Sequence, residues 1–185
     1  AFRPAVKEAL AREGLLMPAL QMIFRISNAN VQTPERYLTG TAHPTVFAGK
    51  DVDMVDMVER AHALEPDALP PLVRLEVLAE VRAVAGEDHF DLGRSEDLCT
   101  TPSVIARIHR RRAQTFRLTV SAKQSLDLHG KPLRFTWVVL RGDAERIRIE
   151  TRDDGAVAEI AVPFHHERPI AQGAPMTSRR VDIGV

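Results

Sequence analysis

In the first 71 residues, apolar side chains recur with the spacing of an α-helix. Apolar side chains recur three to four residues apart on either side of Gly14, which is the spacing of one face of an α-helix. They are Val6 and Leu10 before the glycine, and Leu16, Leu20 and Ile23 after it. Pro18 is well placed as the first residue of the second helix. We therefore expect two short amphipathic helices here.

Two more helices are expected before residue 66. Thr33 and Pro34 have the residue types of an N-cap and a first helical position, so a short helix should run from them until Gly40 ends it. A stronger helix should start near Asp51. Its apolar stripe would contain Met54, Val58 and Ala61, together with Leu64 or Val55. Pro66, Pro70 and Pro71 then close a helical region that covers residues 1–71.

After Pro71 the apolar residues occur at every second position. Apolar residues at Val73, Leu75, Val77, Ala79 and Val81 alternate with mostly polar ones, as in a strand with one buried face. The same run also fits a helix through Leu72, Leu75, Leu78 and Val81, but we favour the strand. Residues 86–101 have no clear period and several turn-forming residues, so 72–101 is expected to be a strand and a linker.

Six short alternating segments follow, separated by turn residues. They are 103–108, 116–122, 133–140, 146–150, 157–162 and 180–185. Regular short strands of this kind are typical of an antiparallel sandwich or barrel. The sequence thus predicts an α+β chain in which a small helical region precedes a β-sandwich over residues 102–185.

One passage between two of these strands combines several turn-forming residues. Asp127 can accept hydrogen bonds from the backbone that follows it, Gly130 can adopt a positive φ, and Pro132 fixes the start of the next strand. In that strand Phe135 and Trp137 lie on one face with Leu133 and Val139. We expect this face to point into the core and not to form a sugar-stacking platform.

The passage resembles the PKD-type (polycystic kidney disease) immunoglobulin-like domain, in which an Asp-Pro-Asp-Gly-like turn precedes Pro-Leu-aromatic-x-Trp. The matching residues are Ser125, Asp127, Gly130, Pro132, Leu133, Phe135, Trp137 and Gly142. Leu128 and His129 replace the usual Pro and second Asp, which argues against a calcium site at this turn. The resemblance implies an immunoglobulin-like sandwich, here without its expected last strand, in a secreted, periplasmic or cell-surface protein. Residues 37–40 and 43–47 resemble portions of uncharacterised bacterial proteins.

Charge and composition narrow the function classes. The apolar and charged fractions, 44% and 27%, are those of a globular protein, and no apolar run is long enough to span a membrane. The net charge of zero argues against nucleic acid as a partner. Lys and Arg outnumber Asp and Glu from Thr101 onward, and the reverse holds before it. The two parts could dock through these charges or present unlike faces to partners.

Candidate chemistry is sparse in this sequence. The single cysteine, Cys99, excludes an intrachain disulfide and a cysteine-based zinc cluster. His165 and His166 should point to opposite faces of a strand, and His62 lacks the spacing of a metal site, so we expect no metal, no cofactor and no catalytic residue. The candidate binding residues are His43 and Thr45, in a loop, and the basic run Arg110, Arg111 and Arg112.

These features favour a non-catalytic binding or spacing module of a larger secreted or cell-envelope bacterial protein, with a polysaccharide or another protein domain as its partner. The alternative is an accessory or catalytic portion of a secreted hydrolase or lyase that acts on polysaccharide. A deep polar cleft between the two parts, lined by converging acids or histidines, would favour the alternative.

Overall fold

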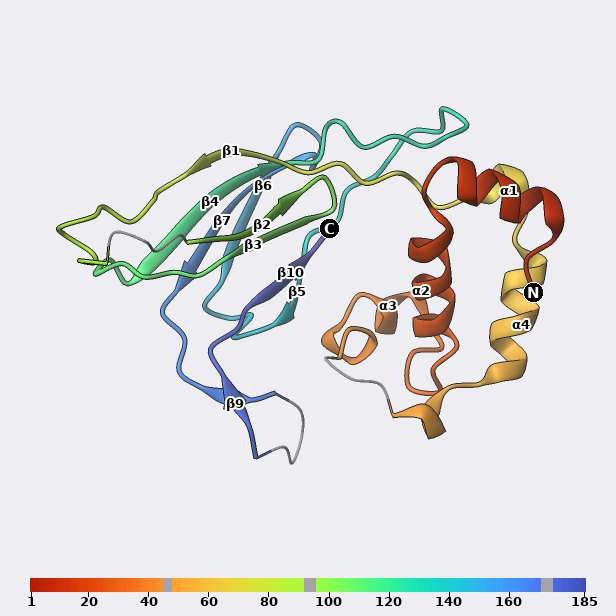
Figure 1. The fold of residues 1–185 in the computed structure, drawn as a ribbon, viewed down its shortest axis with the longest axis horizontal. Helices are drawn as coiled ribbons and strands as arrows, with labels where there is room; N and C mark the ends of the chain where they lie inside the picture. Colours follow the sequence, from red (N-terminus) through yellow and green to blue (C-terminus); the bar gives the residue numbers. More distant parts are fainter. Residues whose placement is uncertain (45–47, 92–95, 171–174) are drawn as a thin grey trace.

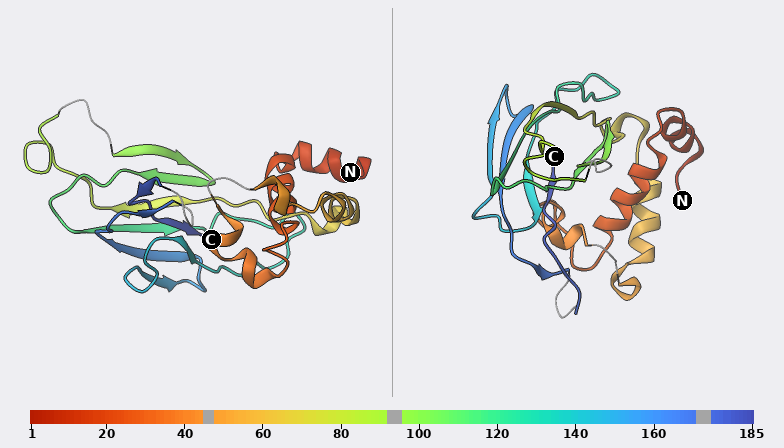
Figure 2. Two further views of the ribbon diagram at one scale, coloured as in Figure 1. Left: turned by 90° about the horizontal axis from the view of Figure 1, so that it is seen from below. Right: turned by 60° about the vertical axis from the view of Figure 1, so that its left-hand side comes forward.

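The chain is an α+β protein, with helices at one end and antiparallel strands at the other (Figure 1). The computed structural model describes residues 1–44, 48–91, 96–170 and 175–185. A second view shows the same division, with the strands running lengthwise away from the helices (Figure 2).

The helical part contains the helices that the apolar spacing predicted, although the second one begins at Leu16 and not at Pro18. The α-helices are α1 (Pro4–Arg12), α2 (Leu16–Ile26), α3 (Pro34–Tyr37) and α4 (Met54–Ala63), and the 3₁₀ turns are η1 (Gly40–Ala42), η2 (Gly49–Asp51) and η3 (Pro66–Ala68). Thr33 caps α3, because its Oγ1 accepts a hydrogen bond from the Arg36 N–H at 3.3 Å. The α1 and α2 helices pack around a core of Val6, Leu10, Leu15, Ala19 and Leu69.

The apolar stripe predicted on α4 is exposed over most of its length. Met54, Val55 and Val58 are 64%, 68% and 52% exposed, whereas Ala61 is 3% exposed. Leu64, just beyond the helix, packs at the edge of the helical core. The stripe lies on one face of the helix as expected, but neighbouring elements cover only its C-terminal end.

A four-stranded antiparallel sheet dominates the other part. Its strands are β1 (Glu76–Glu80), β4 (Thr115–Ser121), β7 (Val157–Pro163) and β6 (Arg148–Arg152), in the spatial order β1-β4-β7-β6. The choice of a strand for the run after Pro71 is therefore confirmed. Because β1 pairs with β4, this strand belongs to the same sheet as three strands from residues 115–163.

Three two-stranded pairs complete the β-structure. They are β2 (Asp97–Thr101) with β3 (Val104–Arg107), β5 (Val138–Arg141) with β10 (Asp182–Gly184), and β8 (Arg168–Pro169) with β9 (Thr177–Ser178). Each of the six predicted segments contains a strand, although the strand in 133–140 begins only at Val138. The β2 strand lies inside the segment that we expected to be a plain connection.

One face of the four-stranded sheet carries the second core. Val120, Ala158 and Ile160 are buried there, and side chains from other elements pack on them, including Ile105 of β3 and Ile183 of β10. Trp137 packs on the same cluster, as predicted, and its Nε1 donates a hydrogen bond to the Gly155 carbonyl at 2.8 Å. This inner face is covered, so the opposite face of the sheet is the outward one.

A β-bulge reverses the faces of β1. The register with β4 shifts between Val77 and Ala79, so the residues after the shift point the other way. The Glu80 side chain is consequently 7% exposed, whereas Val81 is 57% exposed. The prediction that Ala79 and Val81 continue the buried face is wrong for this reason.

The Asp127 turn has the predicted geometry. Asp127 Oδ1 accepts hydrogen bonds from the N–H groups of His129 and Lys131 at 2.8 and 3.1 Å, and Gly130 has φ +71°. Leu128, one of the departures from the PKD pattern, packs against the helical core. Leu128 therefore helps to join the two parts of the molecule. Among the described residues, none of the helices has the length and apolar character that crossing a bilayer requires.

Candidate functional site

His43, a candidate binding residue, is held by partners within the helical part. Its Nδ1 lies 2.6 Å from Nη1 of Arg25 and its Nε2 lies 2.9 Å from the carbonyl oxygen of Tyr37. A guanidinium only donates, so Nδ1 accepts and the protonated Nε2 donates to the carbonyl. Burial lowers the pKa of His43, which favours this neutral ring. Both ring nitrogens of His43 thus hold the loop in place. Thr45, the other candidate binding residue of this loop, lies outside the described residues.

A buried ion pair lies at the end of β3, just before the basic run. Arg107 Nε lies 2.7 Å from Glu80 Oε2 and 3.0 Å from Asp97 Oδ1, and the Arg107 side chain is 8% exposed. Arg82 also pairs with Glu80. Burial raises the pKa of Glu80, but hydrogen bonds from Arg107 and Arg82 outweigh it and the pKa falls below its ordinary value.

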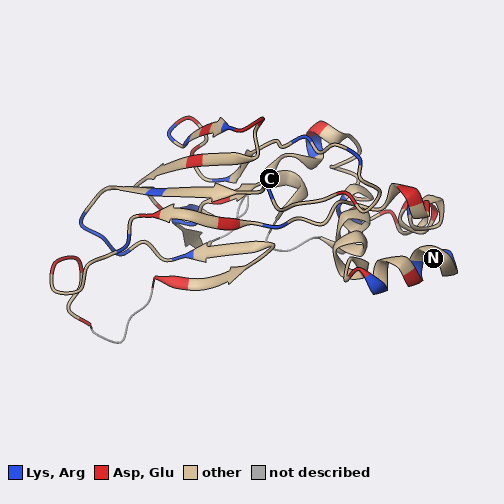
Figure 3. Ribbon diagram, turned by 90° about the horizontal axis from the view of Figure 1, so that it is seen from above, with Lys and Arg blue, Asp and Glu red and all other residues tan. Residues whose placement is uncertain are grey.

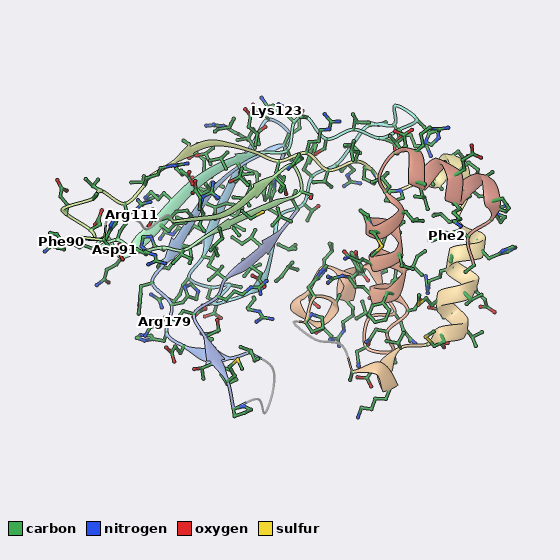
Figure 4. All side chains as sticks on the ribbon, in the orientation of Figure 1. Phe2, Phe90, Asp91, Arg111, Lys123 and Arg179 are labelled. Carbon is green, nitrogen blue, oxygen red and sulfur yellow. The ribbon has the colours of Figure 1, made fainter. Side chains whose placement is uncertain are left out.

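Arg110, Arg111 and Arg112 also serve the structure at this end of the sheet. The N–H groups of Arg110 and Arg112 donate to the carboxylates of Glu96 and Asp88 at 2.9 and 3.0 Å. The Arg111 side chain is 3% exposed and its guanidinium lies 5.7 Å from the centre of the Phe116 ring. Figure 4 places Arg111 far from the helices, close to Phe90 and Asp91. The central arginine of the basic run therefore points inward.

His165 is buried, and each of its two ring nitrogens has a hydrogen-bond partner. Nε2 accepts a hydrogen bond from the Asp143 N–H at 2.9 Å, and Nδ1 lies 2.6 Å from the Pro163 carbonyl oxygen. His166 is exposed, so the two neighbours point apart as predicted. Within the described ranges, no group of three or more His, Cys, Asp and Glu side chains is placed to hold a metal ion.

The site that sequence reasoning missed is a groove on the outward face of the sheet. It encloses about 430 Å³ over β4, β7 and β6. Its lining residues are Thr115, Arg117, Leu118, Thr119, Arg146, Arg148, Glu150, Glu159, Ile160, Ala161 and Pro163. Strand alternation turns every second side chain outward, and the small Ala161 leaves room in the floor.

Cross-strand pairing brings the charged side chains of the groove together. Arg117 and Arg148 both pair with Ala161, one from each neighbouring strand, and Arg146 adds a third guanidinium near them. In the part of the chain that the structure describes, these three arginines have no ion-pair partner and their side chains make no hydrogen bond. Figure 3 shows basic and acidic positions side by side on these strands.

The acidic end of the groove lies two residues along the strands. Glu150 of β6 pairs with Glu159 of β7, which in turn pairs with Thr119 of β4. Glu159 also forms an ion pair with Arg152 at 2.7 Å. The groove therefore combines donors at one end with acceptors and hydroxyl groups at the other.

The chain is thus an α+β protein with an arginine-lined groove on the outward face of an antiparallel sheet. Comparisons of the chain with protein-family models, with curated proteins and with solved structures give no match.

Proposed function

We propose that residues 102–185 belong to an immunoglobulin-like β-sandwich of the PKD type. The Asp127 turn supports this proposal, since its hydrogen bonds and the positive φ of Gly130 are those expected of the motif. Further support comes from the inner face of the sheet, on which Ile105 of β3, Ile183 of β10 and Trp137, just before β5, pack. Two packed layers of strands are the architecture of a sandwich.

We further propose that the chain is a non-catalytic binding module of a larger secreted or cell-envelope bacterial protein. The observation that carries the proposal is the groove, where Arg117, Arg146 and Arg148 are exposed and unpaired among the described residues. Guanidinium groups bind carboxylate, sulfate and phosphate groups through paired N–H donors. The groove is thus suited to an anionic ligand, and the resemblance to PKD-type domains supports the extracellular setting.

Binding explains the acidic end of the groove better than hydrolysis does. A pair of carboxylates is the machinery of most glycosidases, but its general acid needs a poorly solvated environment to hold a proton at neutral pH. Glu150 and Glu159 are both exposed, and Glu159 is paired with Arg152. Such carboxylates are suited to accepting hydrogen bonds from ligand hydroxyl groups.

The test is a titration of isotope-labelled protein, followed by NMR, with four anionic polymers: hyaluronan, polygalacturonate, heparin and poly-glutamate. Binding of at least one should shift amide resonances of β4, β6 and β7, while neutral dextran should not. Shifts confined to other elements, or no shift with any anionic polymer, would contradict the proposed binding face. An assay for new reducing ends in the same samples tests the hydrolase alternative, for which cleavage would have to disappear in Glu150→Gln.

A further inference from the structure

We infer that the groove binds a polysaccharide in which carboxylate-bearing sugars alternate with neutral sugars. This inference rests on the proposed binding function and specifies the ligand of that site. It follows from how the charges are spaced over the sheet.

The basic end has the shape of a cradle for one carboxylate-bearing sugar. Arg117 and Arg148 lie in one row on either side of Ala161, so their Cα atoms are two strand spacings apart, roughly 10 Å. Between them the floor consists of the Ala161 methyl group, which leaves space for a sugar ring. A carboxylate on that ring can receive the planar N–H pairs of either guanidinium.

The acidic end excludes a second anion close to the first. The row that contains Thr119, Glu159 and Glu150 lies two residues away, about 7 Å along the strands. Arg152 partners Glu159, but within the described chain Glu150 makes no ion pair. A polymer with an anion on every unit would place negative charge against these carboxylates. A neutral sugar would instead donate its hydroxyl hydrogens to them.

The remaining lining favours a saccharide over an acidic peptide. Thr115 and Thr119 offer hydroxyl groups that both donate and accept, which matches the hydroxyl groups of a sugar. Of the apolar lining residues, Leu118 and Ile160 belong to the inner core of the sheet, and Ala161 and Pro163 are small, so the groove offers little apolar surface for a peptide side chain.

The experiment is calorimetric titration with hyaluronan oligosaccharides, whose carboxylates occur on every second sugar. Arg117→Gln and Arg148→Gln should each weaken binding by roughly tenfold, the loss expected for one hydrogen-bonded charge pair. Ala161→Leu should also abolish tight binding by filling the floor while leaving every charge in place. The matched control is Arg36→Gln, which removes an exposed arginine from α3 and should leave binding unchanged.

Glu150→Gln separates this inference from the broader proposal. It should weaken hyaluronan binding several-fold, because a neutral amide is a weaker hydrogen-bond acceptor than a carboxylate, and it should tighten binding of polygalacturonate, which carries a carboxylate on every sugar. If polygalacturonate, heparin or poly-glutamate binds the wild-type groove more tightly than hyaluronan, the ligand assignment is overturned and the binding face stands. If no polymer binds, or if the groove variants behave like Arg36→Gln, both the ligand assignment and the proposed binding face are overturned.

Discussion

Two charged side chains, Glu80 and Arg107, lie inside the β-part because of one bulge. The bulge turns Glu80 toward β3, where Arg107 meets it with both side chains less than a tenth exposed. Arg107 also donates to the carbonyl oxygens of Cys99 and Ala106 at 3.0 Å. Burial of a charge is unfavourable unless the charge is paired, so each member of the pair depends on the other.

Arg107→Met should therefore lower the free energy of unfolding by about 3 kcal/mol, because it leaves the Glu80 carboxylate buried with only the exposed Arg82 as a partner. Chemical denaturation measures this change. The double variant Glu80→Gln with Arg107→Met should recover part of the loss, since no buried charge remains. Equal destabilisation of the single and double variants would show that lost packing, and not charge, is responsible.

The same pair sets a pH dependence. The pKa of Glu80 is lowered in the folded chain, because hydrogen bonds from Arg107 and Arg82 outweigh the effect of burial. Its contribution is thus fully present above the pKa of an unfolded glutamate, and it is lost as the pH falls through the lower folded pKa. The stability difference between the wild type and Arg107→Met should accordingly shrink in acid.

At the scale of the single element, the Asp53 side chain caps α4 and fixes where this helix begins. Asp53 Oδ1 accepts hydrogen bonds from the N–H groups of Val55 and Asp56 at 2.9 and 3.0 Å. Asp53→Ala should cost about 1 kcal/mol and speed amide exchange in the first turn of α4. Asp53→Asn keeps an acceptor and should be close to the wild type. A cap that contributes nothing would show equal exchange rates in both variants.

Elements whose signals are local were predictable from the sequence. Thr33 and Pro34 mark the start of α3, and Asp127 with Gly130 marks the turn before β5. Features that depend on contacts with other elements could not be predicted from the sequence. The α4 stripe does not reveal that only its last turn is buried, and β2 became a strand through pairing with β3.

The candidate site could not be predicted for the same reason, since its residues come together only in the folded sheet. Alternation along each strand places Arg117, Arg148 and Ala161 on the same side, but they are distant in the sequence and become neighbours only through the order β4-β7-β6. In the sequence Ala161 lies between the apolar Ile160 and Val162, so no local signal marks it as part of a groove. The residues predicted for binding, His43 and Arg111, are instead tied to internal partners.

The whole molecule is held together by apolar and backbone contacts between the helical part and the strands. Leu72 and Leu126 exchange both backbone hydrogen bonds, at 2.8 and 3.0 Å, and Leu128 packs on the helical core. Lys131 Nζ donates to the Asp67 carbonyl at 2.6 Å. Leu126, Leu128 and Lys131 belong to the Asp127 turn or flank it, so this turn is also the attachment point of the helices.

A second contact between the parts depends on the absence of a side chain at Gly40. A Cβ at this position would collide with the backbone oxygen of Leu140 in β5, whereas a Cβ at Gly49, also in a 3₁₀ turn, would meet nothing within 4 Å. Gly40→Ala should therefore destabilise the chain by about 1–3 kcal/mol, the range for overpacking, while Gly49→Ala should be nearly neutral. Chemical denaturation compares the two, and limited proteolysis should cut Gly40→Ala faster between η1 and α4, because η1 must move off β5. If both alanine variants unfold at the same denaturant concentration, the helical part is free to shift against β5 and this contact does not fix its position.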